Sequence, residues 1–357
     1  MIITISENNY LRFSKVEKEG VIIVKSPDLL KGRLRTGWDL WDTALRIIYL
    51  VRKEFDIIHC VDTRPNVVLP CLALKLILGK AKVIMDWGDW WGRGGTICER
   101  SKSSVLEKMF APIETLFEER FRKYADGTVV LTEALRKRSL RLGIAENTII
   151  KIPHGADIVN ITPRDTHAAR KRLNIDLGRK VLGYVGNIFP SDAELLSSSF
   201  EIINSRTSSV QLLIIGNCKA QFKQQFLQTG KIIKTGRVDF DQLMDYIAAC
   251  DIMLLPLRNS VANNGRWPSK ICDYLAAGKP VVSTKVGDIP MLFKDNLGGY
   301  LSNAEAGDFA SKVLMMLDQD CLIEHGRKAR EIAERELDWN VLTGRLENFY
   351  RYLLRNY

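Results

Sequence analysis

The stretch N-N-G-R-W-P-S-K-I-C-D-Y-L-A-A-G-K-P-V-V-S-T-K-V-G-D-I-P, residues 263–290, decides the fold. Pro268 is tolerated in a first helical turn and Gly278 is a common helix end, so the pattern predicts a helix between them. The β-branched run 281–284 then predicts a buried strand. One helix feeding one buried strand is the repeating unit of a parallel α/β sheet.

Polar residues cluster around the start of this helix. The first N–H groups of a helix are unpaired and its dipole is positive there, so Arg266 and Lys270 are expected to help bind a phosphorylated ligand. Asp273 lies about one turn further on, where a carboxylate can accept hydrogen bonds from the vicinal hydroxyls of a ribose. The alternative is an ordinary solvated Lys–Asp pair on a helix surface.

The segment 268–290 resembles the donor-binding segment of retaining glycosyltransferases of family 4, which have the two-domain GT-B fold. In that family an acid, seven further residues and a second acid precede A-A-G-K-P-V-V. Asp273 matches the second acid, which holds the ribose of the nucleotide. Gly265 falls at the first, so the resemblance implies that the amides of Asn263 or Asn264 meet the donor in its place.

The composition is that of a soluble globular protein large enough for two domains, with 357 residues, 46% of them hydrophobic and 26% charged. The seven cysteines are scattered and form no C-x-x-C pair, which favours a reducing compartment and argues against zinc. The apolar run 67–79 is only about 13 residues long, too short to cross a bilayer. We expect a cytoplasmic protein without a metal or another cofactor.

The formal net charge of +10 is compatible with nucleic acid, an anionic membrane or anionic substrates as partners. The excess is distributed over both halves of the chain and no nucleic-acid-reading motif accompanies it, so no nucleic acid is expected. Basic clusters at residues 31–35 and 136–141 suit peripheral contact with the inner face of an anionic membrane. Solvated helix and loop faces are the competing interpretation.

Two predicted strands of the first half end in polar residues, and ligands bind at the carboxyl ends of strands in open α/β sheets. The strand 56–61 precedes Asp62 and Arg64, and the strand 82–85 precedes D-W-G-D-W-W-G-R-G-G at 86–95. Aromatic faces suit sugars and carboxylates accept from hydroxyls, although a tryptophan-filled domain cleft is the alternative. The expected acceptor-binding residues are Asp62, Arg64, Trp90, Trp91 and Arg93.

Family members often place a histidine at this second strand end, near the transferred sugar. The loop has none, so Asp86 or Asp89 is expected to serve in catalysis, together with Arg266 and Lys270. The following helix, 105–124, carries Glu114, Glu118, Glu119 and Arg120, which we interpret as a salt-bridged surface rather than an acid–base pair. His154 and Asp157 come after the strand 148–153 and either face ligand or belong to a hinge.

The second half opens with a predicted strand at 181–185, followed by Gly186 and Asn187. Family members commonly carry an arginine and a lysine shortly after this strand to neutralise the donor diphosphate. Neither is present here, which makes Arg266 and Lys270 the expected substitutes, because a diphosphate buried without cations is costly. Arg237 and Val238 follow the predicted strand 231–235 and are expected to flank the nucleotide base.

Alternating strands and helices predict an α/β protein with two doubly wound, Rossmann-like domains facing a cleft, the GT-B arrangement. We expect an acceptor-side domain at 1–158, a nucleotide-sugar donor domain at 159–336, and a helix at 337–357 that returns to the first domain. Two short strands are plausible near the N-terminus. Since the family's first strand and glycine-rich loop are not visible there, the first domain is expected to lack them.

The resemblance implies a retaining glycosyltransferase that moves a sugar from a nucleotide-sugar donor to a hydroxyl of a glycan or lipid-linked acceptor, in surface polysaccharide or glycolipid synthesis. The departures at Gly265 and after Asn187 keep an alternative open, a non-catalytic pseudo-glycosyltransferase that acts as a binding or assembly subunit. A nucleic-acid-binding protein would rest on charge alone.

Overall fold

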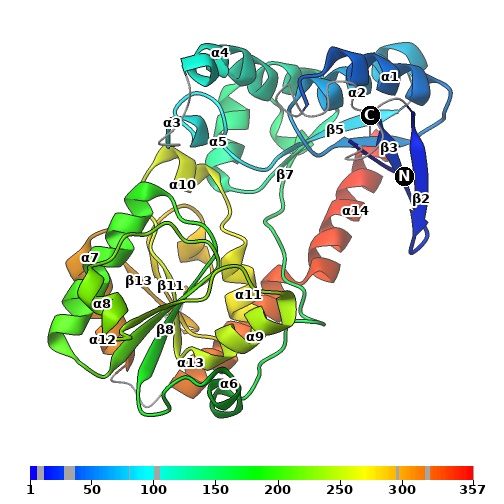
Figure 1. Ribbon diagram of the computed structural model, residues 1–357. Helices are drawn as coiled ribbons and strands as arrows, with labels where there is room; N and C mark the ends of the chain where they lie inside the picture. The colour runs from blue at the N-terminus through cyan, green and yellow to red at the C-terminus, as the bar shows by residue number, and fades with distance from the viewer. Residues whose placement is uncertain are drawn as a thin grey trace.

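The computed structural model describes residues 1–5, 12–27, 37–79, 81–99, 105–294, 297–317 and 322–356. The chain forms two α/β lobes, with the N-terminal lobe above the C-terminal lobe in the view of Figure 1 and the last helix running between them. This confirms the predicted α/β class with parallel sheets. Within the described residues, no helix has both the length and the apolar character needed to cross a membrane.

The C-terminal lobe is built on a six-stranded sheet in the order β10-β9-β8-β11-β12-β13. Every neighbouring pair of strands in this sheet is parallel. Its central strands are buried on both faces, which explains their continuous apolar sequences. The strands are β8 Lys180–Val185, β9 Val210–Ile215, β10 Ile232–Lys234, β11 Ile252–Leu255, β12 Val281–Thr284 and β13 Gly299–Ser302.

Helices cover both faces of this sheet, so it is doubly wound. One core includes Leu196, Phe200 and Phe309 from the helices of one face, and a second includes Met244, Ile271 and Ala329 from the other. The helical elements of this lobe are α6 Thr166–Leu173, α7 Pro190–Arg206, α8 Gln224–Gln228, α9 Phe240–Ala249, α10 Val261–Gly265, α11 Lys270–Ala276, η3 Ile289–Met291, α12 Ala306–Leu317, α13 Leu322–Ile332 and η4 Ala333–Leu337. The predicted helix and strand at 268–284 are confirmed as α11 and β12.

The N-terminal lobe contains a four-stranded parallel sheet in the order β4-β5-β6-β7. Its strands are β4 Ile57–Cys60, β5 Lys82–Trp87, β6 Gly127–Val130 and β7 Ile149–Lys151. Its helical elements are α1 Leu40–Val51, α2 Pro65–Leu78, α3 Thr96–Glu99, α4 Val105–Glu119, η1 Phe121–Tyr124, α5 Glu133–Arg141 and η2 Glu146–Thr148. Helix α2 begins at Pro65, which occupies its first turn, where a missing N–H costs nothing.

Three strands near the N-terminus form a sheet of their own, where two were expected: β1 Ile2–Ile5, β2 Ser14–Lys18 and β3 Val21–Ser26. Strand β1 runs parallel to β3, and β2 pairs antiparallel with β3. Strands β1 and β4 are not hydrogen-bonded to each other, and a cavity of about 800 Å³ lies where residues from both line one space.

The final helix, α14 Trp339–Asn356, leaves the C-terminal lobe and packs on the N-terminal sheet (Figure 1). Leu342, Phe349 and Leu353 share a core with Ile84 and Val129 of that sheet. Where the chain crosses between the lobes, the Ala156 N–H donates to the Leu337 carbonyl over 2.6 Å. The two crossings therefore lie side by side, and α14 fastens the lobes together.

Candidate active site

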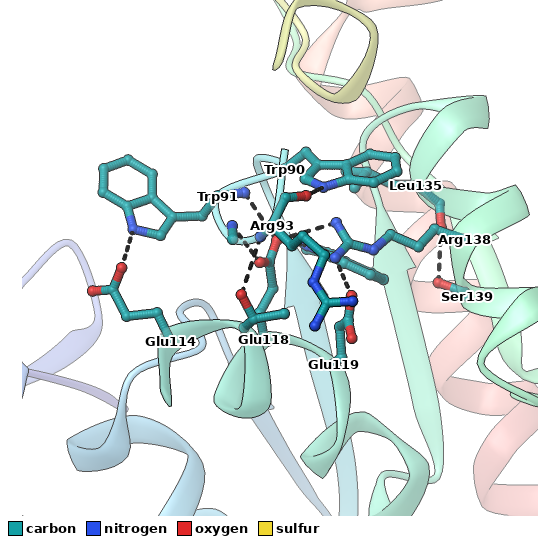
Figure 2. A network of polar contacts seen from close by, with 12 residues as sticks. Trp90, Trp91, Arg93, Glu114, Glu118, Glu119, Leu135, Arg138 and Ser139 are labelled. Atoms are coloured by element: carbon teal, nitrogen blue, oxygen red, sulfur yellow. Dashed lines mark hydrogen bonds and ion pairs between the residues drawn. The ribbon is translucent and has the colours of Figure 1, made fainter. Parts of the chain in front are cut away.

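The tryptophan-rich loop after β5 is held by one buried carboxylate, that of Glu118 on α4 (Figure 2). Glu118 is 1% exposed. It accepts hydrogen bonds from the Trp87 indole at 2.7 Å, from the Trp91 N–H at 2.9 Å and from the Gly92 N–H at 2.5 Å. Three donors from the loop converge on one side chain, which fixes the backbone of the loop against α4.

Two buried guanidinium groups balance this carboxylate. Arg122 donates to the Glu118 carbonyl and to the Asp86 carbonyl, each over 2.8 Å, and lies 4.3 Å from the Trp87 ring centre. Burial lowers the pKa of Arg122 to about 10, and the Glu118 carboxylate opposes that shift. Arg138 forms an ion pair with Glu119 and lies 3.9 Å from the Trp90 ring centre.

The expectation that the acids of the 105–124 helix form a salt-bridged surface is wrong for Glu114 and Glu118. Both side chains are buried, and Glu114 accepts from the Trp91 indole over 3.1 Å (Figure 2). An indole N–H needs an acceptor when it is buried, and these two acids meet the indoles of the preceding loop. Helix periodicity alone could not show that partner.

Trp90 reaches across to the C-terminal lobe and packs on Gly265. A Cβ atom added at Gly265 would lie 2.3 Å from the Trp90 Cβ, closer than any real contact. Side chains other than hydrogen are therefore excluded at position 265 unless the tryptophan moves. Trp90 does not line the cavity of the N-terminal lobe that is described next. Its side chain packs between the two lobes instead.

A cavity of about 230 Å³ opens at the carboxyl ends of β4 and β5. Asp62 and Arg64 line it and face each other at 3.5 Å. Asp86 also lines it, and burial raises the pKa of this carboxyl to about 6. The Asp86 Oδ1 atom is buried and accepts no hydrogen bond from the described residues. Trp91 contributes an aromatic wall, so four of the predicted side chains, Asp62, Arg64, Asp86 and Trp91, meet here.

The other two predicted residues of the loop, Asp89 and Arg93, lie in different surroundings from each other. Asp89 lines the rim of the same cavity, and burial raises its pKa while the Arg266 charge opposes the rise, which places Asp89 within electrostatic reach of the C-terminal lobe. The Arg93 side chain is exposed and outside the cavity lining, while its N–H donates to the Thr115 hydroxyl over 3.0 Å.

On the C-terminal lobe, Lys270 lies against the turn that follows β8. Its Nζ donates to the Tyr184 hydroxyl over 2.7 Å and to the Asn187 carbonyl over 3.0 Å. A Cβ at Gly186 would lie 4.0 Å from the same Nζ. Burial, and next the charge of Arg266, lower the pKa of Lys270 to about 7. The lysine thus stands at the turn where the sequence itself supplies no cation.

Arg266 has a partner that the sequence analysis missed. Its Nη2 pairs with the Asp192 Oδ2 at 3.1 Å, and its guanidinium lies 4.1 Å from the Phe189 ring centre. Asp192 is 1% exposed and also accepts from the Asn263 amide over 3.0 Å. The sequence did indicate that Asp192 lies at the start of a helix, because an acid in the first turn after a proline marks a helix start.

The remaining residues predicted to bind the donor differ in how far their side chains are already hydrogen-bonded within the protein. The Asn263 amide is buried, and the Asn264 amide donates to Asn259 and Ser260 and accepts from the Gly287 N–H, so the local loop uses both side chains. Burial raises the pKa of Asp273 to about 6, and the negative charge of Asp157 adds to the rise. Asp273 and Asp157 are therefore close enough to interact.

Arg237 is exposed and Val238 is half-buried against the core, directly after β10. His154 is half-buried, its carbonyl accepts from the Cys272 thiol over 3.2 Å, and burial lowers the pKa of its ring. Within the described residues, no group of three His, Cys, Asp or Glu side chains is arranged to hold a metal ion.

The lobes also meet at Asp288, a residue that the sequence analysis did not single out. Its carboxylate accepts from the Glu133 N–H at the start of α5, over 3.1 Å to each oxygen. The same carboxylate pairs with the Lys151 ammonium at 2.8 Å. An acid from one lobe thus caps a helix of the other.

Comparison with known proteins gives a consistent result. A family model described as "Glycosyl transferases group 1" matches residues 179–319. A putative teichuronic acid biosynthesis glycosyltransferase of Bacillus subtilis is 25% identical over 271 residues, covering 73% of this chain and 64% of the relative. A sucrose-phosphate synthase structure from Thermosynechococcus elongatus aligns with a TM-score of 0.70 at 15% identity, covering 98% of this chain and 88% of that one.

Residues 179–319 thus match the group 1 glycosyltransferase family, and the chain as a whole has the GT-B fold. Another GT-B neighbour, Anabaena HepE in complex with UDP, has a TM-score of 0.67 at 15% identity, and the alignment covers 87% of this chain and 82% of that one. The chain spans about half to two thirds of the length of the first curated relatives it matches, from 49% to 64%. The predicted fold is confirmed, and the predicted family is matched over residues 179–319.

Proposed function

We propose that the protein is a retaining glycosyltransferase that moves a sugar from a nucleotide-sugar donor to a hydroxyl of a glycan or lipid-linked acceptor. The observation that carries the proposal is the position of Lys270, whose ammonium lies on the Gly186–Asn187 turn at the carboxyl end of β8. This edge of an open α/β sheet is where ligands bind. An ammonium there can stabilise a leaving diphosphate, with Arg266 beside it.

The other donor contacts follow from the same edge. Asp273, three residues after Lys270 on α11, accepts hydrogen bonds from the ribose hydroxyls. Residues Arg237 and Val238 flank the base after β10, two strands away from β8 in the sheet. Because the Asn263 amide donates to Asp192 and the Asn264 amide donates to the Ser260 carbonyl, their part is to shape the turn that presents Arg266.

The acceptor binds in the cavity of the N-terminal lobe. The unpartnered Asp86 Oδ1 accepts a hydrogen bond from the acceptor hydroxyl and orients it toward the donor. In the transfer step the bond from the sugar C1 to the diphosphate oxygen breaks, the acceptor oxygen bonds to C1 on the same face, and the hydroxyl proton passes to the leaving diphosphate. Lys270 and Arg266 carry the charge that develops there, so no cofactor is proposed.

The activities named for the relatives support the kind of acceptor. These relatives include putative teichuronic acid biosynthesis glycosyltransferases of Bacillus subtilis and a lipopolysaccharide 1,2-N-acetylglucosaminetransferase of Salmonella typhimurium, 27% identical over 164 residues. We therefore propose that the protein acts on a surface polysaccharide or glycolipid at the inner face of the membrane, with the exposed Lys137 and Arg141 of α5 contacting anionic lipid. The other basic cluster, at 31–35, lies outside the described residues.

The test is the melting temperature of the purified protein with UDP-, GDP-, ADP- and TDP-sugars. A ligand at about 100 times its Kd stabilises the folded state by about 2.7 kcal/mol. We expect a selective rise, UDP-sugars first because HepE was solved with UDP. Asp273→Ala should abolish the rise, whereas Asp241→Ala, at a side chain 91% exposed, should keep it.

A flat response to every nucleotide would instead support a non-catalytic pseudo-glycosyltransferase, a binding or assembly subunit. Two observations favour that second candidate enough to keep it. Trp90 covers Gly265, the position of the family's first acid, and Asp192 already neutralises Arg266.

A further inference from the structure

The volume of the cavity in the N-terminal lobe, about 230 Å³, and its lining residues indicate which kind of sugar it can bind. This inference rests on the proposed function, since it concerns the acceptor side of the same site. Drug-sized ligands occupy pockets of roughly 300–1,000 Å³, so this cavity suits one sugar ring rather than an oligosaccharide. Trp38, Trp91 and Phe117 supply flat apolar walls against which the C–H face of a ring can pack.

The charged groups that line the cavity are unequal in sign. Among the described residues of the lining, four are acidic and one is a guanidinium: Asp62, Asp86, Asp89, Glu114 and Arg64. Arg64 is not fully available to an anionic ligand, because it already faces Asp62 at 3.5 Å. Glu114 accepts a hydrogen bond from the Trp91 indole over 3.1 Å. Arg122 offsets part of the Asp86 charge and Arg266 part of the Asp89 charge from outside the lining. The described part of the lining therefore has more acidic than basic side chains.

Two polar atoms of the lining lack a partner among the described residues, the Trp38 indole N–H and the Asp86 Oδ1 atom, and a sugar hydroxyl can serve both because it donates and accepts. The Asp86 Oδ1 atom is buried and has no partner among the described residues. A buried polar oxygen without a donor is costly, so a ligand that brings one is favoured. A hydroxyl or an ammonium supplies that donor, whereas a carboxylate or phosphate supplies a repelling charge.

We propose that this cavity takes one acceptor sugar ring that is neutral or carries an amino group, and that it rejects a ring carrying a carboxylate or a phosphate. Charge selects the acceptor here: the amino sugar binds best, the neutral sugar next, and the uronic acid worst. The rejection comes from the surplus carboxylates rather than from shape, since the three kinds of ring have nearly the same size.

The experiment uses three matched probes: the methyl glycosides of glucosamine, glucose and glucuronic acid. Their dissociation constants for the whole protein are measured by saturation-transfer NMR at pH 7.5 and low salt, first without nucleotide and then with UDP present. We expect the neutral ring to bind at least about tenfold more tightly than the uronic ring, which corresponds to about 1.4 kcal/mol. Equal or tighter binding of the uronic ring overturns the proposal, and so does the absence of binding by all three.

A variant pair isolates the cause. Asp62→Asn removes a carboxylate and frees Arg64, so the ratio of the dissociation constants of the uronic and neutral rings should fall at least about threefold. Asp241→Asn removes a carboxylate that is 91% exposed and outside this cavity, and it should leave that ratio unchanged. A ratio that Asp62→Asn does not lower overturns the electrostatic explanation.

These outcomes are separable from those of the proposed function. Ring binding requires neither a donor sugar nor turnover. The donor panel can therefore fail while the rings still discriminate by charge, which would leave a sugar-binding lobe without transferase activity. The donor panel can also succeed while the protein binds the three rings equally, which would refute the proposed acceptor preference alone.

Discussion

Replacing Glu118 by Gln tests whether one buried carboxylate holds the tryptophan loop. The amide has nearly the shape of the carboxylate, so packing is kept and only hydrogen bonding and charge change. Its single oxygen can still accept from the Trp87 indole and the Trp91 N–H, which share one oxygen in the native chain. Its NH2 group then faces the Gly92 N–H, which donated to the other oxygen at 2.5 Å.

The expected cost follows from these contacts. A buried N–H left without an acceptor costs about 1–3 kcal/mol, and turning two charge-assisted bonds into neutral ones costs roughly 1 kcal/mol each. Arg122 and Arg138 also lose their nearby negative charge, and breaking a buried ion pair on one side costs about 3–5 kcal/mol. Both routes give a loss of roughly 3–5 kcal/mol in the free energy of unfolding of the N-terminal lobe.

Urea unfolding followed by tryptophan fluorescence measures this loss, because Trp87, Trp90 and Trp91 all report on the loop. The matched control is Glu119→Gln, next along the chain, where the side chain is 28% exposed and its amide oxygen can still accept from Arg138. We expect the control to lose less than about 1 kcal/mol. Equal losses in the two variants would refute the reasoning and show that packing, not the carboxylate, holds the loop.

Three further perturbations test the contact between the lobes and the donor site. Gly265→Ala places a Cβ 2.3 Å from the Trp90 Cβ, so urea unfolding should show a loss of about 1–3 kcal/mol that Trp90→Gly in the same chain, which removes that Cβ, partly reverses. The pKa of Lys270 is about 7, and a bound diphosphate should raise it, so the affinity for UDP should fall as pH rises above 7. Calorimetry of UDP binding at pH 8, in buffers of different ionisation heat, should show proton uptake that Lys270→Arg abolishes. Equal binding heats in all buffers would contradict this. Asp288→Ala removes the acceptor of Lys151, so small-angle scattering should show a larger radius of gyration, and an unchanged radius would mean that other contacts hold the lobes.

The fold was predictable because it follows from short-range patterns. The segment 263–290 contains a helix end at Gly278 and a β-branched strand at 281–284, and both lie where expected. The long helix α7 was missed since its sequence, with Ser197, Ser198 and Ser199 in a row, carries a weak apolar period. Tertiary packing rather than propensity stabilises such a helix, through buried Leu195, Leu196 and Phe200.

The site was predictable in its residue types and less so in its contacts. Strand ends pointed to Asp62 and Asp86, which line the cavity of the N-terminal lobe, and a helix start pointed to Lys270, which lies on the β8 turn. Sequence could not show which acids pair with which donors, because the partners are far apart along the chain. Glu118 meets Trp87 across 31 positions, and Asp192 meets Arg266 across 74. These contacts depend on how helices pack on a sheet, which hydrophobic periodicity leaves open.

The departure from the family's motif at Gly265 is coupled to a contact between the two lobes. The side chain missing at Gly265 would occupy the space that Trp90 fills, so an acid there and this tryptophan are mutually exclusive. Glu118 fixes the backbone next to Trp90, and Arg138 packs on the indole from the N-terminal lobe. A carboxylate at 265 beside Arg266 would also compete with Asp192 for that cation. The loss of the acid is therefore tied to the gain of an aromatic contact between lobes, and restoring the acid alone is expected to lower stability rather than raise activity.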